Sequence, residues 1–451
     1  MGRTHPKREF PVLKHKNIKN ISQFFYCDLF PGLRFSLLII SQLKIKYKGG
    51  LNETQIKINP ESSQAFSCHT FPRFHDRMWG GGGGAGGVSN SGPAPTPALY
   101  SYGISSGSTT NSPGSVGVVG IDSAGVGISS QFYSGVTTSE PVAEASATVG
   151  GKSFLYVVIQ NSNVVDEFAV NGLNVTKLGS VATGVGPVSI YVDPSRNLVF
   201  VGDSNNTTAG GGDIYSYTIN SNGTLSPVGT PAFSNVDPVY AVQEDTTGTY
   251  LIAGCEIGNP VSGWVAKSFM VNTDGTLTYV ASSGSGAGIV PAYFAVVPNT
   301  TNGDILYGAV QFPYNNSPYF YTVVVTSSTV TLTSTPKTSG NYYSPAWIDP
   351  TGTWLFEATY NPSTNSEVLT QYKIGASGSL TLGPEGSLTV ANGNNGFIGG
   401  VTNSVSGYIS TSGTVIFPLG YALLYNAMNG SLSNPKVLSL NGADGTDVFL
   451  P

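Results

Sequence analysis

The stretch P-V-S-I-Y-V-D-P-S-R-N-L-V-F-V-G-D, residues 187–203, holds two apolar runs separated by an Asp-Pro turn. Pro187 opens the first run and Leu198 opens the second, and both are rich in the β-branched and aromatic residues typical of strands. The run Ile214–Ile219 follows, and Asn222-Gly223 then forms a turn before Leu225. Such turn residues between short apolar runs predict four consecutive antiparallel strands.

This pattern recurs along the chain. A proline opens the first run of successive units at Pro141, Pro187, Pro238, Pro291 and Pro345. The second runs begin at Leu155, Leu198, Leu251, Leu306 and Leu355. A Gly-x-Leu turn, or a near equivalent, closes the third run at Gly223, Gly275, Gly378 and Gly430. Four short strands in about 50 residues match the size of one β-propeller blade.

The two ends of the repeat complete each other. The first unit, from about Leu99, begins at its second strand, whereas Asp447–Leu450 resembles an isolated first strand. Six complete units start at 141, 187, 238, 291, 345 and about 397, and the composite unit makes a seventh. We therefore predict an all-β fold, a seven-bladed β-propeller of four-stranded blades whose ring the C-terminal strand closes.

Composition agrees with this fold class. Charged residues make up 10% of the 451 residues, and there are 58 glycines; an average soluble protein has about 25% charged residues. Such a chain is a poor helix former, yet 40% hydrophobic residues suffice for a core. No run reaches the roughly 18 apolar residues of a membrane span.

The chain joins two kinds of sequence. Residues 1–79 carry a net charge of +8, and residues 80–451 carry −13. We expect 1–79 to be a basic extension, irregular or disordered, or a product of a misassigned start codon. We expect 80–98 to be a Gly/Ser/Pro-rich tether and 99–451 to be the propeller. The apolar cluster Phe35–Ile40 is short for a secretion signal, and no cleavage site follows it.

The repeat resembles that of the seven-bladed lactonase-type propellers, a family named for bacterial 6-phosphogluconolactonase. The resemblance rests on the proline-led strand, the Asp-Pro turn at Asp193 and Asp349, and the Gly-x-Leu turns, and it covers about 99–451. It implies a lactone-hydrolysing ancestry and a site at one mouth of the central channel. Sites of this family are expected to use His, Arg and acidic residues, but 80–451 contains no His and only one Arg, Arg196.

Polar residues follow the second strands in register, and we predict that they ring one channel mouth. They are Gln160, Asp203, Glu256, Gln311 and Tyr360; the loops entering the first strands add Asp237, Tyr293, Tyr342 and Tyr343. Asp203 and Glu256 fall on adjacent blades and are suited to acid/base chemistry or to Ca²⁺ binding with backbone carbonyls. The alternative is that strands simply end in polar residues at solvent. Glu357, within a second strand, is a further candidate acid.

The residues favour a non-catalytic binding or scaffold module over an enzyme. Without His, residues 80–451 cannot form a Ser-His-Asp triad, and they contain few cations that could bind a phosphate group. The alternative is a lactonase-like carboxylic-ester hydrolase that acts on an uncharged lactone through its mouth carboxylates. We predict no catalytic metal and no cofactor, although structural Ca²⁺ is a second option. The expected partner is a small molecule, a carbohydrate or a protein, and not nucleic acid. We expect a monomer in the periplasm or outside the cell.

Overall fold

A computed structural model of the chain divides it into two units, Met1–Ser91 and Gly92–Pro451. The structure describes residues 24–30 and 33–38 of the first unit. In the second unit it describes 96–105, 113–122, 127–139, 141–193, 195–204, 211–229, 232–234, 237–257, 263–284, 291–297, 304–310, 319–336, 346–349, 351–361, 366–375, 378–392, 408–409, 414–417, 421–425, 432–437 and 447–450. No helix in these ranges is long and apolar enough to cross a membrane.

The first unit contains a β-hairpin. Strand β1 (Phe24–Phe30) pairs antiparallel with β2 (Leu33–Leu38), and Tyr26 lies opposite Ser36. This differs from our expectation that residues 1–79 are irregular or disordered. The reason is that the apolar cluster is not isolated: Phe24–Phe30 supplies a second aromatic run, and Pro31-Gly32 between them is a turn-forming dipeptide.

The second unit is all β, and its strands form four-stranded antiparallel sheets in sequence order. One sheet contains β6 (Pro141–Val149), β7 (Lys152–Ile159), β8 (Val164–Asn171) and β9 (Asn174–Ala182). The sheet after it contains β10 (Pro187–Asp193), β11 (Leu198–Asp203), β12 (Ile214–Ile219) and β13 (Leu225–Pro227). The next two are β14 (Val239–Glu244), β15 (Tyr250–Ile257), β16 (Gly263–Val271), β17 (Leu277–Ser282), and β18 (Pro291–Val297), β19 (Asp304–Val310), β20 (Tyr319–Val325), β21 (Val330–Pro336).

Further along, one sheet contains β22 (Ala346–Ile348), β23 (Trp354–Asn361), β24 (Ser366–Ile374) and β25 (Leu380–Asn392). Another contains β26 (Tyr408–Ile409), β27 (Thr414–Phe417), β28 (Tyr421–Tyr425) and β29 (Leu432–Val437). The last sheet joins the two ends of the unit. In it, β30 (Asp447–Leu450) pairs with β3 (Leu99–Ser105), followed by β4 (Ser115–Ile121) and β5 (Gly127–Tyr133). Val448 lies opposite Tyr102, as predicted for a C-terminal first strand.

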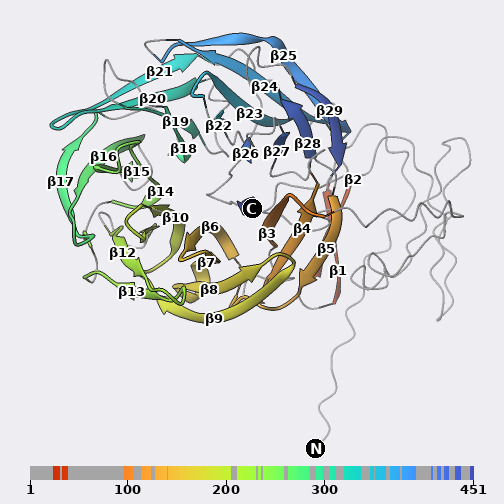
Figure 1. The fold of residues 1–451 in the computed structure, drawn as a ribbon. Helices are drawn as coiled ribbons and strands as arrows, with labels where there is room; N and C mark the ends of the chain where they lie inside the picture. Colours follow the sequence, from red (N-terminus) through yellow and green to blue (C-terminus); the bar gives the residue numbers. More distant parts are fainter. Residues whose placement is uncertain are drawn as a thin grey trace, which may run out of the picture. The chain divides into compact units, whose positions relative to one another are not determined.

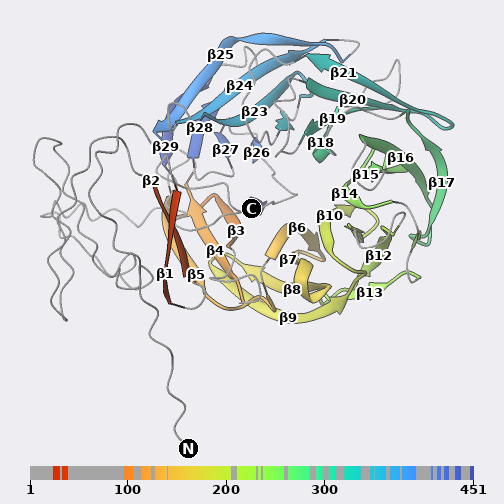
Figure 2. The same ribbon diagram turned by 180° about the vertical axis from the view of Figure 1, so that it is seen from behind.

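The sheets stand around a common axis, as in a β-propeller (Figure 1). The first strands β6, β10, β14 and β18 lie innermost and contact one another in turn, and β9, β13 and β17 lie at the rim. The view from behind shows the same order (Figure 2). The predicted propeller of four-stranded blades is therefore confirmed.

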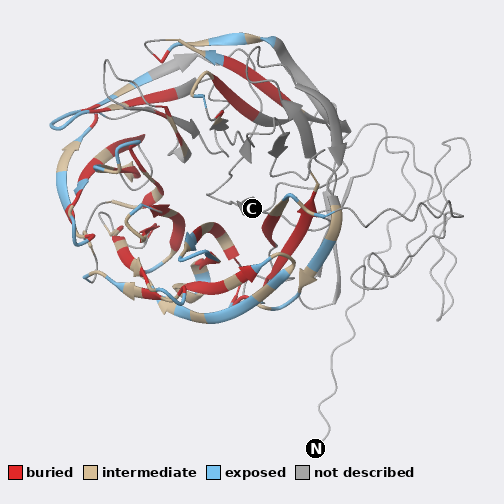
Figure 3. Cartoon of the chain, in the orientation of Figure 1, coloured by how far each residue is buried: buried red, intermediate tan, exposed pale blue. Residues whose placement is uncertain are grey.

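The core lies between neighbouring sheets. Val158 of β7 packs in one buried cluster with Val199 of β11, and Phe200 of β11 packs in another with Leu251 of β15. Figure 3 shows buried residues along the inner strands, while every residue of the rim strand β9 is exposed or partly exposed. Since a propeller sheet buries both faces against its neighbours, the second strands β7 and β11 are almost continuously buried.

The Gly-x-Leu turns join each sheet to the one before it. Gly172, Gly223 and Gly275 have positive φ angles of 58°, 87° and 84°. A Cβ atom on these glycines would lie 3.2 Å from Tyr100, 2.1 Å from Phe154 and 2.9 Å from Leu198, all in the second strand of the preceding sheet. The turn thus needs glycine for both its backbone conformation and its contact.

Candidate functional site

Gln160, Asp203, Asp237 and Glu256 lie at one end of their sheets, where the chain passes from the rim strand of one sheet to the first strand of the next. We call this the connecting face and define it by Gln160, Ala182–Gly186, Asp203, Asp237 and Glu256. Pairing of Pro187 with Asp203 and of Val239 with Cys255 places these segments at the same ends of their sheets.

Gln160 begins a single 3₁₀ turn, Gln160–Ser162, directly after β7. The turn ends at Asn163, whose φ of 54° is left-handed. The Asn163 carbonyl accepts the N–H of Thr183 (2.9 Å), and its side-chain Oδ1 accepts the N–H of Gly186 (2.9 Å). Since Gly186 O in turn accepts the N–H of Ser204 (2.8 Å), the segment after Gln160 is connected to that around Asp203.

Asp203, the last residue of β11, is fully buried. Its Oδ1 accepts the N–H of Asp213 at 2.8 Å, whereas no hydrogen-bond partner reaches Oδ2 within the described part of the chain. A Cβ atom on Gly184 would lie 1.7 Å from Oδ2, so the glycine backbone packs directly on the carboxyl group. Burial raises the pKa of Asp203 to about 7; the hydrogen bond from Asp213 lowers it, and the charge of Asp213 raises it.

The pairing register differs by one residue from the one we expected for Asp203 and Glu256. Pro187 pairs with Asp203 and Val239 pairs with Cys255, so Cys255 occupies the position of Asp203 in the next sheet. Asp203 and Cys255 are both fully buried, while Glu256 is partly exposed. Because side chains alternate along a strand, Glu256 belongs to the other face of its sheet. Its N–H bonds to Pro238 O at 2.9 Å.

Lys267 belongs to this face although the sequence did not indicate it. It lies within β16, and its Nζ is 2.7 Å from Oδ2 of Asp237, which precedes β14, the first strand of the same sheet. Both side chains are partly exposed. Asp237 has a φ of 80°, unusual for a residue with a side chain. No local spacing links two residues 30 positions apart, so only the three-dimensional pairing reveals them.

The remaining predicted residues are less informative. Gln311, Tyr342 and Tyr343 lie outside the described residues. Tyr360 lies in β23 and Tyr293 in β18, and for these two residues only the backbone is described. Glu357 is fully buried in β23, where its Oε2 accepts the hydroxyl of Tyr372 at 3.2 Å.

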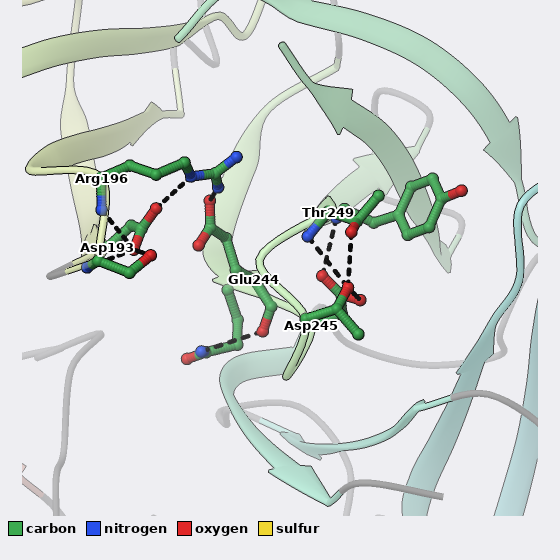
Figure 4. Close-up of polar contacts among 9 residues, drawn as sticks. Asp193, Arg196, Glu244, Asp245 and Thr249 are labelled. Atoms are coloured by element: carbon green, nitrogen blue, oxygen red, sulfur yellow. Dashed lines mark hydrogen bonds and ion pairs between the residues drawn. The ribbon is translucent and has the colours of Figure 1, made fainter. Parts of the chain in front are cut away.

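Arg196, the only arginine of residues 80–451, lies in the turn between β10 and β11, at the end of this sheet opposite to Asp203. Figure 4 shows it together with Asp193 and Glu244. Arg196 pairs with Asp193 in its own turn and with Glu244 of the next sheet. Burial raises the pKa of Glu244 to about 8, and the charge of Asp193 adds to this; Arg196 opposes it. Asp193 also accepts the N–H of Ser195 at 2.8 Å, as predicted for a turn aspartate. This network holds two sheets together.

Comparison with known proteins gives the fold. No protein-family model matches the sequence, and no curated protein matches it. Among solved structures, the periplasmic gluconolactonase of Pseudomonas aeruginosa is 12% identical with a TM-score of 0.56, covering 78% of this chain and 99% of that one. A putative 6-phosphogluconolactonase from Bacteroides fragilis is 12% identical with a TM-score of 0.55 (80% and 100% covered).

A protein from Lactobacillus plantarum is also similar, at 16% identity and a TM-score of 0.54 over 78% of this chain and 99% of that one. The chain therefore shares the fold of lactonase-type propellers, as the repeat predicted. At such identities, similarity extends to the fold and does not fix an activity.

Proposed function

We propose that this chain is a non-catalytic β-propeller that binds an uncharged polar ligand, or a polar protein segment, at its connecting face. The main observation in support is the ion pair of Lys267, the cation described at this face. Its Nζ lies 2.7 Å from Oδ2 of Asp237, which neutralises its charge. Phosphate recognition requires cations that are clustered and available. Lys177 pairs with Asp166 (3.0 Å), and Arg196 pairs with two carboxylates at the opposite face.

A second candidate is a hydrolase of an uncharged lactone. The observation in its favour is Asp203, a buried carboxyl group with a pKa of about 7 and an unbonded Oδ2 among the described residues. A carboxyl group that titrates near neutral pH is suited to general acid/base work. The likeness to the lactonase-type fold supports the same candidate.

Turnover separates the two candidates. The full-length protein would be incubated with 6-phosphogluconolactone and with uncharged glucono- and galactono-lactones, and hydrolysis compared with the spontaneous rate. We expect no acceleration of any of them. The hydrolase would instead be supported if the protein accelerates hydrolysis of an uncharged lactone and Asp203→Asn abolishes this activity. Asp274→Asn is the control and should keep the activity, since Asp274 lies in an exposed turn.

We further propose seven blades, a propeller that occupies 99–451 behind a tether at 80–98, and a monomer exported from the cytoplasm. The ring closure of β30 on β3 and the four-stranded sheets support the blade number. Light scattering on the eluting protein tests the monomer, and an experimental structure tests the blade number. Limited proteolysis tests the boundaries, with first cuts expected within 80–98.

A further inference from the structure

Asp203 occupies a position that is apolar in the neighbouring sheets. The residue that pairs with the start of the first strand is Ile159 in the sheet before, Cys255 in the sheet after, and Val310 in the one beyond. Ile159, Asp203 and Cys255 are all fully buried. Since an apolar side chain satisfies this packing position, the fold itself does not require a carboxyl group there.

The segment Thr183–Gly186, which links β9 to β10, covers this carboxyl group. Its backbone packs on the side chain, because a Cβ atom on Gly184 would lie 1.7 Å from Oδ2 of Asp203 and 2.6 Å from the ring of Tyr215. Oδ2 is buried, and no hydrogen-bond partner reaches it among the described residues. The segment therefore shields the carboxyl group from water without donating a hydrogen bond to it.

Hydrogen bonds hold this covering segment at its two ends. The N–H groups of Thr183 and Gly186 donate to Asn163, each at 2.9 Å. The N–H of Ser204 donates to the carbonyl of Gly186 at 2.8 Å. Between these ends the side chain of Val185 is 52% exposed. A segment that buries so little apolar surface can open locally, and opening breaks these three hydrogen bonds.

The groups that face Asp203 favour its neutral form. The N–H of Asp213 donates to Oδ1 of Asp203, and Tyr215 and Tyr217 follow at alternate positions of β12, so all three lie on the same face as Asp203. The covering segment and the turn Gln160–Asn163 contain no titratable side chain. Burial raises the pKa of Asp203 to about 7, and the like charge of Asp213 adds to this.

We propose that Asp203 is a pH-dependent switch: the segment Thr183–Gly186 is closed over the protonated carboxyl group and opens when this group ionises. A buried carboxylate whose second oxygen accepts no hydrogen bond is costly, and opening hydrates it. Opening therefore increases from acid to neutral pH and exposes a carboxylate on the connecting face. This inference goes beyond the proposed function and does not depend on which ligand that face binds.

Hydrogen–deuterium exchange of the full-length protein, followed by mass spectrometry, measures this opening at the amides of Thr183, Gly186 and Ser204. Each rate is divided by the intrinsic exchange rate at that pH. The pKa of Asp203 is raised from 3.8 to about 7, so the open form releases a proton that the closed form keeps. Opening should thus increase by up to about tenfold per pH unit from roughly pH 4 to 7 and level off above.

Two variants separate the switch from ordinary local motion. Asp203→Asn keeps the shape of the side chain but cannot ionise, so the increase with pH should disappear. Asp213→Asn removes the like charge and keeps the backbone N–H that bonds to Asp203, so the levelling-off should shift to lower pH. The amide of Gly275, which donates to Asn272 at 2.9 Å in another sheet, is the internal control and should show no such increase.

Opening that does not depend on pH in the wild-type protein, or an increase that Asp203→Asn retains, overturns this inference. Thermal unfolding shows whether the Asn variant is folded. If it is not, an unchanged pH profile in Asp213→Asn overturns the switch instead. The lactone assay remains the separate test of the proposed function, because the exchange experiment contains no ligand or substrate.

Discussion

The phenol hydroxyl of Tyr156 donates a hydrogen bond of 3.0 Å to the carbonyl oxygen of Gly223 in the next sheet. Tyr102 makes the equivalent bond to Gly172 O, at 2.6 Å, one sheet earlier. In both cases a second-strand tyrosine reaches the glycine turn of the following sheet. The turn is thus a contact between sheets as well as a link between strands.

Replacing Tyr156 by Phe should lower the free energy of unfolding by about 0.5–1.5 kcal/mol, because it removes a buried hydrogen bond and leaves a carbonyl without this donor. Urea denaturation followed by tryptophan fluorescence measures the change. Tyr279→Phe is the control, since Tyr279 is 46% exposed and should show almost no effect. Equal losses in the two variants would contradict the role of this contact.

Replacing Gly223 by Ala should destabilise the protein by about 2 kcal/mol or more, because its positive φ disfavours a side chain and its Cβ would meet the Phe154 ring. Gly150→Ala provides a comparison. Gly150 has a φ of 58° but nothing within 4 Å of a new Cβ, so it reports the backbone effect alone. In the same urea denaturation experiment, the free energy of unfolding of Gly223→Ala should be well below that of Gly150→Ala.

Replacing Asp203 by Asn should change how stability depends on pH. The pKa of Asp203 is raised from 3.8 to about 7, so the folded chain keeps a proton there that the unfolded chain loses at lower pH. The protonated carboxyl group therefore contributes to the free energy of unfolding at low pH, and this contribution is lost as the pH rises from roughly 4 to 7. We expect the Asn variant to gain stability relative to the wild type across this window. A pH-independent difference in unfolding free energy would refute the buried proton.

Replacing Arg196 by Met should destabilise the protein by about 2 kcal/mol or more, because Glu244 and Asp193 are buried and would lose their shared cation. The pKa of Glu244 is raised to about 8, so its charge develops mainly above that pH. The loss should thus be larger at pH 9 than at pH 6, as measured by urea denaturation. Lys152→Met, at the exposed start of β7, should have little effect at either pH. A loss from Arg196→Met no larger than this would argue against the network.

Much of the fold could be predicted from local patterns. Each turn aspartate accepts nearby backbone N–H groups, as Asp349 does from Trp354 at 2.8 Å, and each apolar run forms the strand that its residues favour. The hairpin at Phe24–Leu38 was missed because we considered its second strand without the first.

The site shows where local patterns fall short. We aligned second strands on their leucines, which placed Glu256 level with Asp203. In the structure the two second strands are equivalent when the turn aspartates Asp193 and Asp245 are aligned. Asp193 pairs with Leu198, and the N–H of Asp245 donates to the carbonyl of Tyr250, so Tyr250 and not Leu251 is the equivalent of Leu198. Counting from Asp193 and Asp245 would have given Asp203 and Cys255, so this signal was present in the sequence.

The amino-acid sequence by itself determined the strands, the turns and their grouping into sheets, because alternation, β-propensity and turn chemistry act over a few residues. Only the tertiary structure decided that Gly184 covers Asp203, that Lys267 meets Asp237, and that Arg196 joins Glu244 across two sheets. These contacts join segments up to 48 residues apart. Their partners are set by how the sheets pack around the ring, which no local pattern encodes.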